Sequence, residues 1–80
     1  MTTQIFFLKH VYGPRVLGFE TEKDRDDMVH SLRLSGHTVE AIDLAAAWDI
    51  MEPDGQGYRR VTMMSSQGYY RLPPDYLASN

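Results

Sequence analysis

The chain has 80 residues, 42% of them hydrophobic, no cysteine and a formal net charge of -3. This length suits one domain, the apolar fraction argues against disorder, and the absence of cysteine excludes disulfides and thiolate metal sites. No apolar run approaches the ~20 residues of a membrane span, and the start lacks the basic leader of a signal peptide. These features predict a soluble, cytoplasmic single domain over residues 1–76, followed by a flexible tail over residues 77–80, with no membrane partner.

The first half of the chain predicts a hairpin, a helix and a third strand. QIFFLKHV and RVLGFE are rich in β-branched and aromatic residues and flank a turn signal at Gly13-Pro14. Both faces of the first strand are apolar, which is typical of a central strand. A helix over about 22–35 follows from the N-cap Thr21, early acidic residues, and Gly36 after its end. HTVEAID then alternates as a strand, with Val39, Ala41 and Asp43 sharing one side.

The second half contains one ambiguous segment and a second hairpin. LAAAWDIME favours a short helix through its alanines, although it also fits a strand in which Trp48 and Ile50 share a face. Residues 53–57 form a turn or loop. YRRVTMM and GYYRL are two strands joined by SSQ, and two prolines stop any strand before the C-terminus. The predicted fold is therefore α+β: a small antiparallel sheet with one main helix packed on it, ordered β-β-α-β-(short α or β)-β-β.

The middle of the chain is acidic. Residues 20–54 contain ten acidic residues against three basic ones, whereas both ends are mildly basic. Ordinary solvated faces explain such a pattern, and two oppositely charged surfaces that steer a partner are the alternative. The predicted acidic surface consists of Glu22, Asp24, Asp26, Asp27 and Glu40.

The sequence contains no recognisable catalytic constellation. His30 lies one helical turn from Asp26 and Asp27, but two ligands do not make a metal site, and an exposed helix pair explains them. Ser65 and Ser66 fall in a predicted turn without a neighbouring base. A domain of this size also has little room for a buried cleft of ~300 Å³ or more. We therefore predict no enzyme activity, no catalytic residues, no metal and no cofactor.

Tyrosine and arginine gather in the last part of the chain. Strand alternation places Val61, Met63, Tyr70 and Leu72 toward the core. The opposite set points outward, and with Tyr76 it forms the predicted partner-binding surface: Tyr58, Arg60, Tyr69, Arg71 and Tyr76. Tyr and Arg dominate protein-interface hot spots because each combines contact area with a polar tip. Cross-strand Tyr–Arg packing that only covers a sheet is the alternative.

The general layout resembles small phage-encoded accessory proteins, among them anti-CRISPR proteins and other host-takeover inhibitors. The resemblance lies in residues 1–43: a hairpin, the acidic helix opening ETEKDRDD, and SGHTVEAID returning as a strand. It implies a non-enzymatic inhibitor acting in the host cytoplasm. Its partner would be a larger host protein or nucleoprotein complex, with the acidic surface occupying a nucleic-acid-binding groove.

Two other functions fit the same residues. Aromatic and arginine side chains also bind single-stranded nucleic acid, but a sequence pI of about 5.4 and three clustered arginines predict weak, salt-sensitive binding, so direct contact with nucleic acid is the less favoured reading. A sheet edge also permits a homodimer, which is compatible with either partner.

Overall fold

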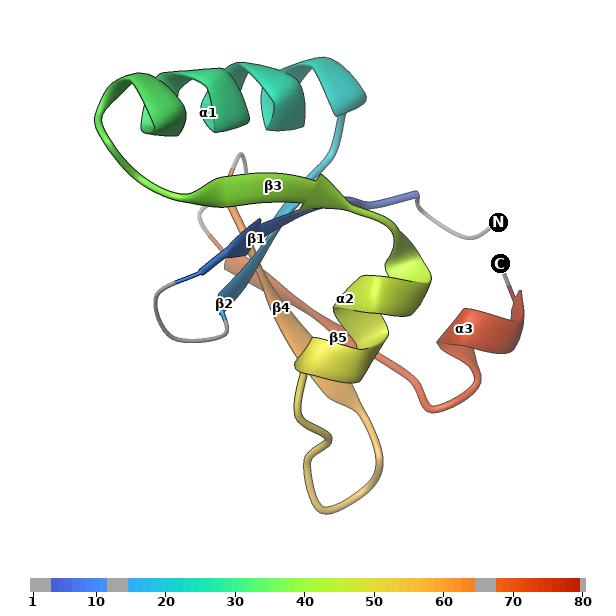
Figure 1. The fold of residues 1–80 in the computed structure, drawn as a ribbon. Helices are drawn as coiled ribbons and strands as arrows, with labels where there is room; N and C mark the ends of the chain where they lie inside the picture. The colour runs from blue at the N-terminus through green and yellow to red at the C-terminus, as the bar shows by residue number, and fades with distance from the viewer. Residues whose placement is uncertain (1–3, 12–14, 65–67, 80) are drawn as a thin grey trace.

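The computed structural model describes residues 4–11, 15–64 and 68–79 as a five-stranded sheet with helices on both faces (Figure 1). The elements follow in the order β1 (Phe6–His10), β2 (Arg15–Phe19), α1 (Glu22–Leu34), β3 (Val39–Ile42), α2 (Leu44–Ile50), β4 (Arg59–Met63), β5 (Gly68–Leu72) and α3 (Tyr76–Ser79). The α+β class and the order of elements are confirmed, and the ambiguous segment is the short helix α2. The predicted turns at 12–14 and 65–67, with Ser65 and Ser66, lie outside the described residues.

The strands lie in the order β3-β1-β2-β4-β5. β1 pairs antiparallel with β2 and β3, and β4 pairs antiparallel with β5, but β2 and β4 run parallel. The sheet is therefore mixed rather than wholly antiparallel. A parallel pair needs a long crossover, which the segment from α1 to the loop before β4 supplies.

Helices cover the two faces of the sheet (Figure 1), and a small core lies on each face. On one face α1 packs against β3, β1 and β2, and the buried residues there are Leu8, Phe19, Val29 and Val39. On the other face α2 and α3 complete a larger cluster that includes Phe7, Trp48, Val61, Met63, Leu72 and Tyr76. β1 contributes side chains to both cores, which confirms the interpretation of its two apolar faces.

Local signals explain where the two longer helices begin and end. The Thr21 hydroxyl accepts a hydrogen bond from the Asp24 amide at 3.1 Å, and Gly36 has φ of 89° just after the end of α1. Asp43 does not continue β3 as its alternation predicted: its carboxylate caps α2 by accepting from the Ala46 amide at 2.9 Å. Among the described residues, no helix is long and apolar enough to cross a membrane.

The C-terminal residues form a helical turn that packs on α2. The Tyr76 ring stacks against Trp48, with 6.4 Å between ring centroids and an interplanar angle of 7°. Residues 77–79, for which a flexible tail was predicted, continue this turn. The anchor at Tyr76 therefore ties the end of the described chain to the larger core.

Candidate functional site

The four outward side chains predicted on the second hairpin share one face of the sheet. Arg60 pairs directly with Arg71 across β4 and β5, and Thr62 pairs with Tyr69. This is the face that α1 covers over β3, β1 and β2. Because α1 packs at the other end of the sheet, Tyr69 is 56% exposed and both arginines are exposed. We call Tyr58, Arg60, Tyr69 and Arg71 the Tyr/Arg face.

Each arginine of the Tyr/Arg face stacks on a tyrosine: Arg60 on Tyr69 of β5, and Arg71 on Tyr58, the residue just before β4. The Arg60 guanidinium lies 4.5 Å from the Tyr69 ring centroid, and the Arg71 guanidinium lies 3.9 Å from that of Tyr58. Both distances are within the range of cation–π contacts, which are worth roughly 0.5–1 kcal/mol at exposed sites. The contacts order the four side chains as two stacked pairs, Arg60 with Tyr69 and Arg71 with Tyr58.

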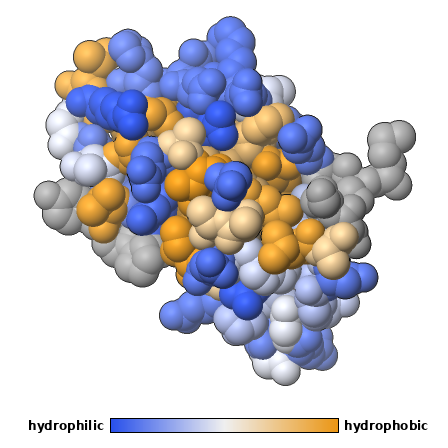
Figure 2. All heavy atoms as spheres, turned by 45° about the vertical axis from the view of Figure 1, so that its right-hand side comes forward, coloured by the Kyte–Doolittle hydropathy of each residue, from blue (hydrophilic) through white to orange (hydrophobic). Residues whose placement is uncertain are grey.

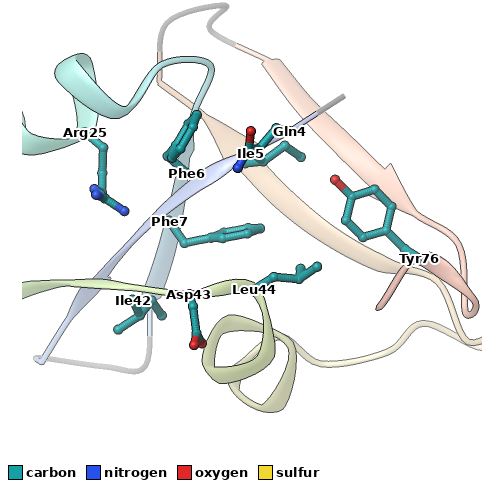
Figure 3. Close-up of a pocket in the computed structure, with 9 residues that line it drawn as sticks. All are labelled: Gln4, Ile5, Phe6, Phe7, Arg25, Ile42, Asp43, Leu44 and Tyr76. Atoms are coloured by element: carbon teal, nitrogen blue, oxygen red, sulfur yellow. The ribbon is translucent and has the colours of Figure 1, made fainter. Parts of the chain in front are cut away.

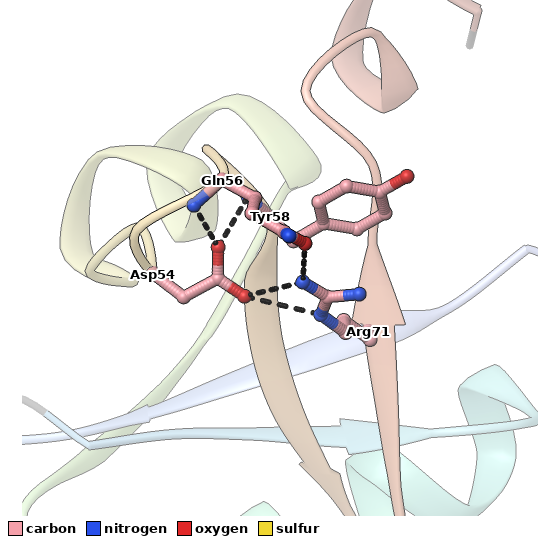
Figure 4. Close-up of polar contacts among 4 residues, drawn as sticks. All are labelled: Asp54, Gln56, Tyr58 and Arg71. Atoms are coloured by element: carbon pink, nitrogen blue, oxygen red, sulfur yellow. Dashed lines mark hydrogen bonds and ion pairs between the residues drawn. The ribbon is translucent and has the colours of Figure 1, made fainter.

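The loop before β4 fixes Arg71 further (Figure 4). Arg71 donates from Nε and Nη2 to one oxygen of Asp54, at 3.0 and 2.9 Å, and from Nη2 to the Gln56 side chain at 2.7 Å. The other Asp54 oxygen accepts from the backbone amides of Gln56 and Tyr58, at 2.8 and 3.0 Å. The hydrogen bond from the Gln56 backbone amide lowers the pKa of Asp54 most. The hydrogen bonds from Arg71 and from the Tyr58 amide lower it further, so this pKa lies below its usual value.

Sequence reasoning missed Asp54 and Gln56 as supports of this face. An Asp followed by Gly-Gln-Gly is a signal for a turn in which the carboxylate accepts from amides further along the chain. The contact with Arg71 is 17 residues away in sequence and follows only from the strand pairing. The loop therefore orients Arg71, whereas Arg60 has no carboxylate partner among the described residues. Arg60 and Tyr69 are the members of the Tyr/Arg face that are most available to a partner.

The structure corrects the placement of Tyr76. It was grouped with the partner-binding surface, but it is only 8% exposed and belongs to the larger core. The reason is α3: the helical turn after the two prolines directs the ring onto Trp48. Tyr76 therefore contributes to stability on the opposite face of the sheet.

The predicted acidic residues do not form one surface. Asp24 and Asp27 face the β4 side of α1, whereas Asp26 lies on its other side, toward β3. Glu40 pairs with Lys9 at 3.7 Å and points to the opposite face of β3 from buried Val39. Within α1, Lys23 pairs with Asp27 at 2.8 Å, and Arg25 pairs with Glu22 and Asp26. The hydrogen bond to Asp27, together with the negative charge of that carboxylate, raises the pKa of Lys23.

A shallow groove of about 340 Å³ joins α1 to the Tyr/Arg side of the sheet. Its apolar floor comes from Phe19, Met28 and Met64, and its rim carries Asp24, Asp27 and Ser31. Met64 is 39% exposed, a large fraction for an apolar side chain beside the core. Acidic groups, an apolar strip and the Tyr/Arg face thus follow one another across a single face of the sheet.

A second hollow lies at the start of β1, on the face seen in Figure 2, where apolar residues gather below the hydrophilic surface of α1. It has a volume of about 460 Å³ and is open to the surface, so it is not the buried cleft for which the sequence predicted little room. Figure 3 shows Arg25 on one side and Tyr76 on the other. The lining residues are Gln4, Ile5, Phe6, Phe7, Arg25, Ile42, Asp43, Leu44 and Tyr76.

The cleft has little electrostatic preference for an anion. The Arg25 side chain is 13% exposed and stacks over Phe6, with 5.8 Å between its guanidinium and the ring centroid. Two carboxylates already flank this guanidinium, at 3.7 Å for Glu22 and 2.9 Å for Asp26. No serine, histidine or lysine is among the described residues that line the cleft, and its one carboxylate, Asp43, accepts a hydrogen bond from the Ala46 amide as the N-cap of α2.

The histidines form no metal centre in the described part of the chain. His10 Nε2 lies 3.1 Å from His37 Nδ1, at the end of β1 and in the loop after α1. No group of three or more metal-ligating side chains occurs among residues 4–11, 15–64 and 68–79. His30 stays on the exposed side of α1.

Comparison with known proteins gives no relative from which a role could be transferred. No family model matches the chain, and neither a curated protein nor a solved structure matches it.

Proposed function

We propose that the protein is a small, non-catalytic protein-binding module that docks a partner on the Tyr/Arg face. The observation that carries the proposal is the uncovered second hairpin: α1 packs on β3, β1 and β2, while Tyr69 is 56% exposed on the same face. An exposed aromatic ring with an arginine stacked on it offers a large, pre-ordered contact area at low entropic cost.

The adjoining groove supports the choice of a protein partner. Protein interfaces combine an apolar centre with a polar rim. Here the exposed Met64 and the groove floor lie between acidic α1 and Arg60. A partner that carries an apolar side chain flanked by charges of both signs would fit this arrangement.

The resemblance to phage accessory proteins suggests the biological setting of the proposal. In that setting the module inhibits a larger host protein or a nucleoprotein complex in the host cytoplasm, as anti-CRISPR proteins do. Self-association through a sheet edge is compatible with this role. The acidic residues Asp24 and Asp27 would contact the same partner from the far side of the groove.

Single-stranded nucleic acid is the second candidate ligand of the same face. Exposed Tyr69 and Arg60 could stack on a base and meet a phosphate. The net charge of -3 opposes it, because weak binding to few phosphates falls steeply with salt. Retention of a single-stranded oligonucleotide at low salt, lost on Arg60→Ala, would favour this candidate over a protein partner.

The test of the proposal is partner capture followed by direct binding. Immobilised protein is incubated with lysate of the organism in which it acts, retained proteins are identified by mass spectrometry, and the purified candidate is titrated by calorimetry. We expect Arg60→Glu to weaken the affinity by roughly tenfold or more, as truncation of hot-spot residues does. Unchanged thermal unfolding of Arg60→Glu would show that the domain still folds.

A matched control makes this test specific. Lys9→Glu changes the net charge by the same amount on the opposite face of the sheet, where its ion pair with Glu40 is exposed. It should bind like the wild type. If Arg60→Glu binds normally while Asp24→Lys with Asp27→Lys does not, the acidic side of the groove is the site and the assignment to the Tyr/Arg face is wrong.

A further inference from the structure

The outer edge of β5 carries backbone groups that no strand of the described chain pairs. β5 is the last strand in the sheet order. The Met64 amide donates to the Gly18 carbonyl at 3.0 Å, so even-numbered residues of β4 direct their backbone groups toward β2 and odd-numbered ones toward β5. Val61 therefore exchanges hydrogen bonds with Tyr70, its partner in the register. It follows that Tyr69 and Arg71 direct their N–H and C=O groups away from the sheet.

Within the described residues this edge is short, and it is bounded on its C-terminal side. Pro73, the next residue with the same orientation, has no N–H to donate. Proline and short length are devices that prevent open-ended aggregation along a strand edge. A pairing limited to Tyr69 and Arg71 is therefore suited to a closed, two-fold contact rather than to a fibre.

We propose that two copies of the chain pair antiparallel along β5, with Tyr69 of one copy opposite Arg71 of the other. A two-fold axis through the Tyr70 pair then satisfies all the outward backbone groups of Tyr69 and Arg71 reciprocally. The register shifted toward Pro73 is worse, because it places Arg71 opposite Arg71 and Tyr69 opposite Pro73. That register adds like-charge repulsion between the two arginines. It also leaves the Tyr69 carbonyl without a hydrogen-bond donor, because Pro73 has no N–H. The register test below distinguishes the shift the other way, which places Tyr69 opposite Tyr69.

Side-chain chemistry favours the same register. Tyr69 is 56% exposed and already lies beneath Arg60 in its own copy. In the dimer it gains Arg71 of the second copy as its direct cross-strand neighbour, so a second guanidinium can stack on the same ring. On the other face, the half-buried Tyr70 rings meet at the axis as an aromatic pair. The inference uses the edge of β5 and does not rest on the proposed partner.

The first test separates backbone pairing from side-chain loss at one position. Sedimentation velocity over a concentration series should show a monomer–dimer equilibrium for the wild type. Tyr69→Pro removes the outward amide without touching the bonds to β4, whereas Tyr69→Ala keeps that amide. We expect Tyr69→Pro to weaken dimerisation roughly tenfold or more relative to Tyr69→Ala, since two hydrogen bonds per dimer are lost. A wild type that stays monomeric at every concentration, or equal dimerisation of the two variants, overturns the proposal.

The second test measures the register and does not depend on the proline variant. The chain has no cysteine, so each introduced thiol is unique. A mixture of Tyr69→Cys and Arg71→Cys should form a mixed disulfide under mild oxidation, because directly paired residues lie within bridging distance. Each variant alone should form far less, since the equivalent residues of the two copies are diagonal neighbours roughly 7–8 Å apart.

A control position and a contrary result complete the register test. Thr62→Cys, on β4 and away from the edge, should not cross-link. Strong cross-linking of Tyr69→Cys with itself would place Tyr69 opposite Tyr69 and overturn the proposed register. Cross-linking of Thr62→Cys as efficient as that of the mixture would indicate random collision and overturn the dimer.

Discussion

The two faces of the second hairpin differ in burial: one is packed in the core and the other is exposed. On one face Val61, Met63 and Leu72 are buried beneath α2 and α3, whereas on the other the Tyr/Arg face is left uncovered by α1. Arg59 and Arg60 show the contrast within one strand. Arg59 donates to the backbone carbonyls of Trp48, at 3.0 Å, and Met51, and its guanidinium lies 4.8 Å from the Trp48 ring centroid. Arg60 stacks only on exposed Tyr69.

This comparison shows that residue type alone does not reveal what an arginine does. Arg59 closes the C-terminal end of α2, where helix carbonyls have no intrahelical donor. It is therefore a structural group. Arg60 faces solvent from the next position on the strand, so loss of its charge should affect binding rather than folding. Stability measurements on variants of the two faces test this division.

The largest effect is expected at Trp48. Its side chain is 9% exposed, stacks on Tyr76 and supports Arg59. Trp48→Ala should lower the free energy of unfolding by about 3–5 kcal/mol, which is a large share of the stability of a small domain. Urea unfolding followed by far-UV circular dichroism measures this loss. Tyr69→Ala on the other face should change the same quantity by about 0.5 kcal/mol or less, and equal losses at the two positions would contradict the division between the faces.

A smaller effect separates the adjacent arginines. Methionine retains an unbranched apolar stem but has no donor, so Arg59→Met leaves the carbonyls at the end of α2 without a partner. We expect a loss of about 1–3 kcal/mol in the free energy of unfolding for Arg59→Met, and about 0.5 kcal/mol or less for Arg60→Met. Thermal and urea unfolding of the two variants in parallel provide the measurement. If Arg60→Met proved the more destabilising, the Tyr/Arg face would be a structural cover.

Sequence patterns predicted the features that depend on residues close by in the chain, namely the helices and the faces of the strands. Strand alternation assigned Val61, Met63, Tyr70 and Leu72 to the core and the Tyr/Arg face to the outside. Burial and register confirm Val61, Met63 and Leu72 as core and Arg60, Tyr69 and Arg71 as exposed, whereas Tyr58 and Tyr70 are half-buried. The main helix was also predicted closely, because its N-cap, its early acidic residues and Gly36 act locally. The same is true of α2, whose alanines favour helix over strand.

Features that depend on tertiary packing could not be predicted in the same way. The parallel pairing of β2 with β4 follows from where the crossover through α1, β3 and α2 returns the chain. Tyr76 looked like a member of the surface because no local pattern indicates that a short turn will place it on Trp48. The link from Asp54 to Arg71 joins a loop to a strand and depends on the pairing of β4 with β5.

The smallest effect is expected at Asp54, where it takes the form of a pH dependence. Asp54→Asn keeps a side-chain oxygen for the Gln56 and Tyr58 amides but removes the charge that pairs with Arg71. The wild type should therefore be slightly more stable at neutral pH. Hydrogen bonds from backbone amides and Arg71 lower the pKa of Asp54 in the folded state from 3.8. The ionised carboxylate therefore adds to the free energy of unfolding above pH 3.8, and this addition is lost as the pH falls through the folded pKa.

The stability difference between the wild type and Asp54→Asn should accordingly shrink in acid, below pH 3.8. Urea unfolding of both proteins across this range measures the difference directly. Glu52→Gln, which neutralises an exposed carboxylate two residues earlier, should show no comparable convergence. A difference that stays constant down to the most acidic pH would mean that Asp54 stabilises the loop through hydrogen-bond geometry alone. In that case its charge would not orient Arg71, and the Tyr/Arg face would owe its order to stacking on Tyr58.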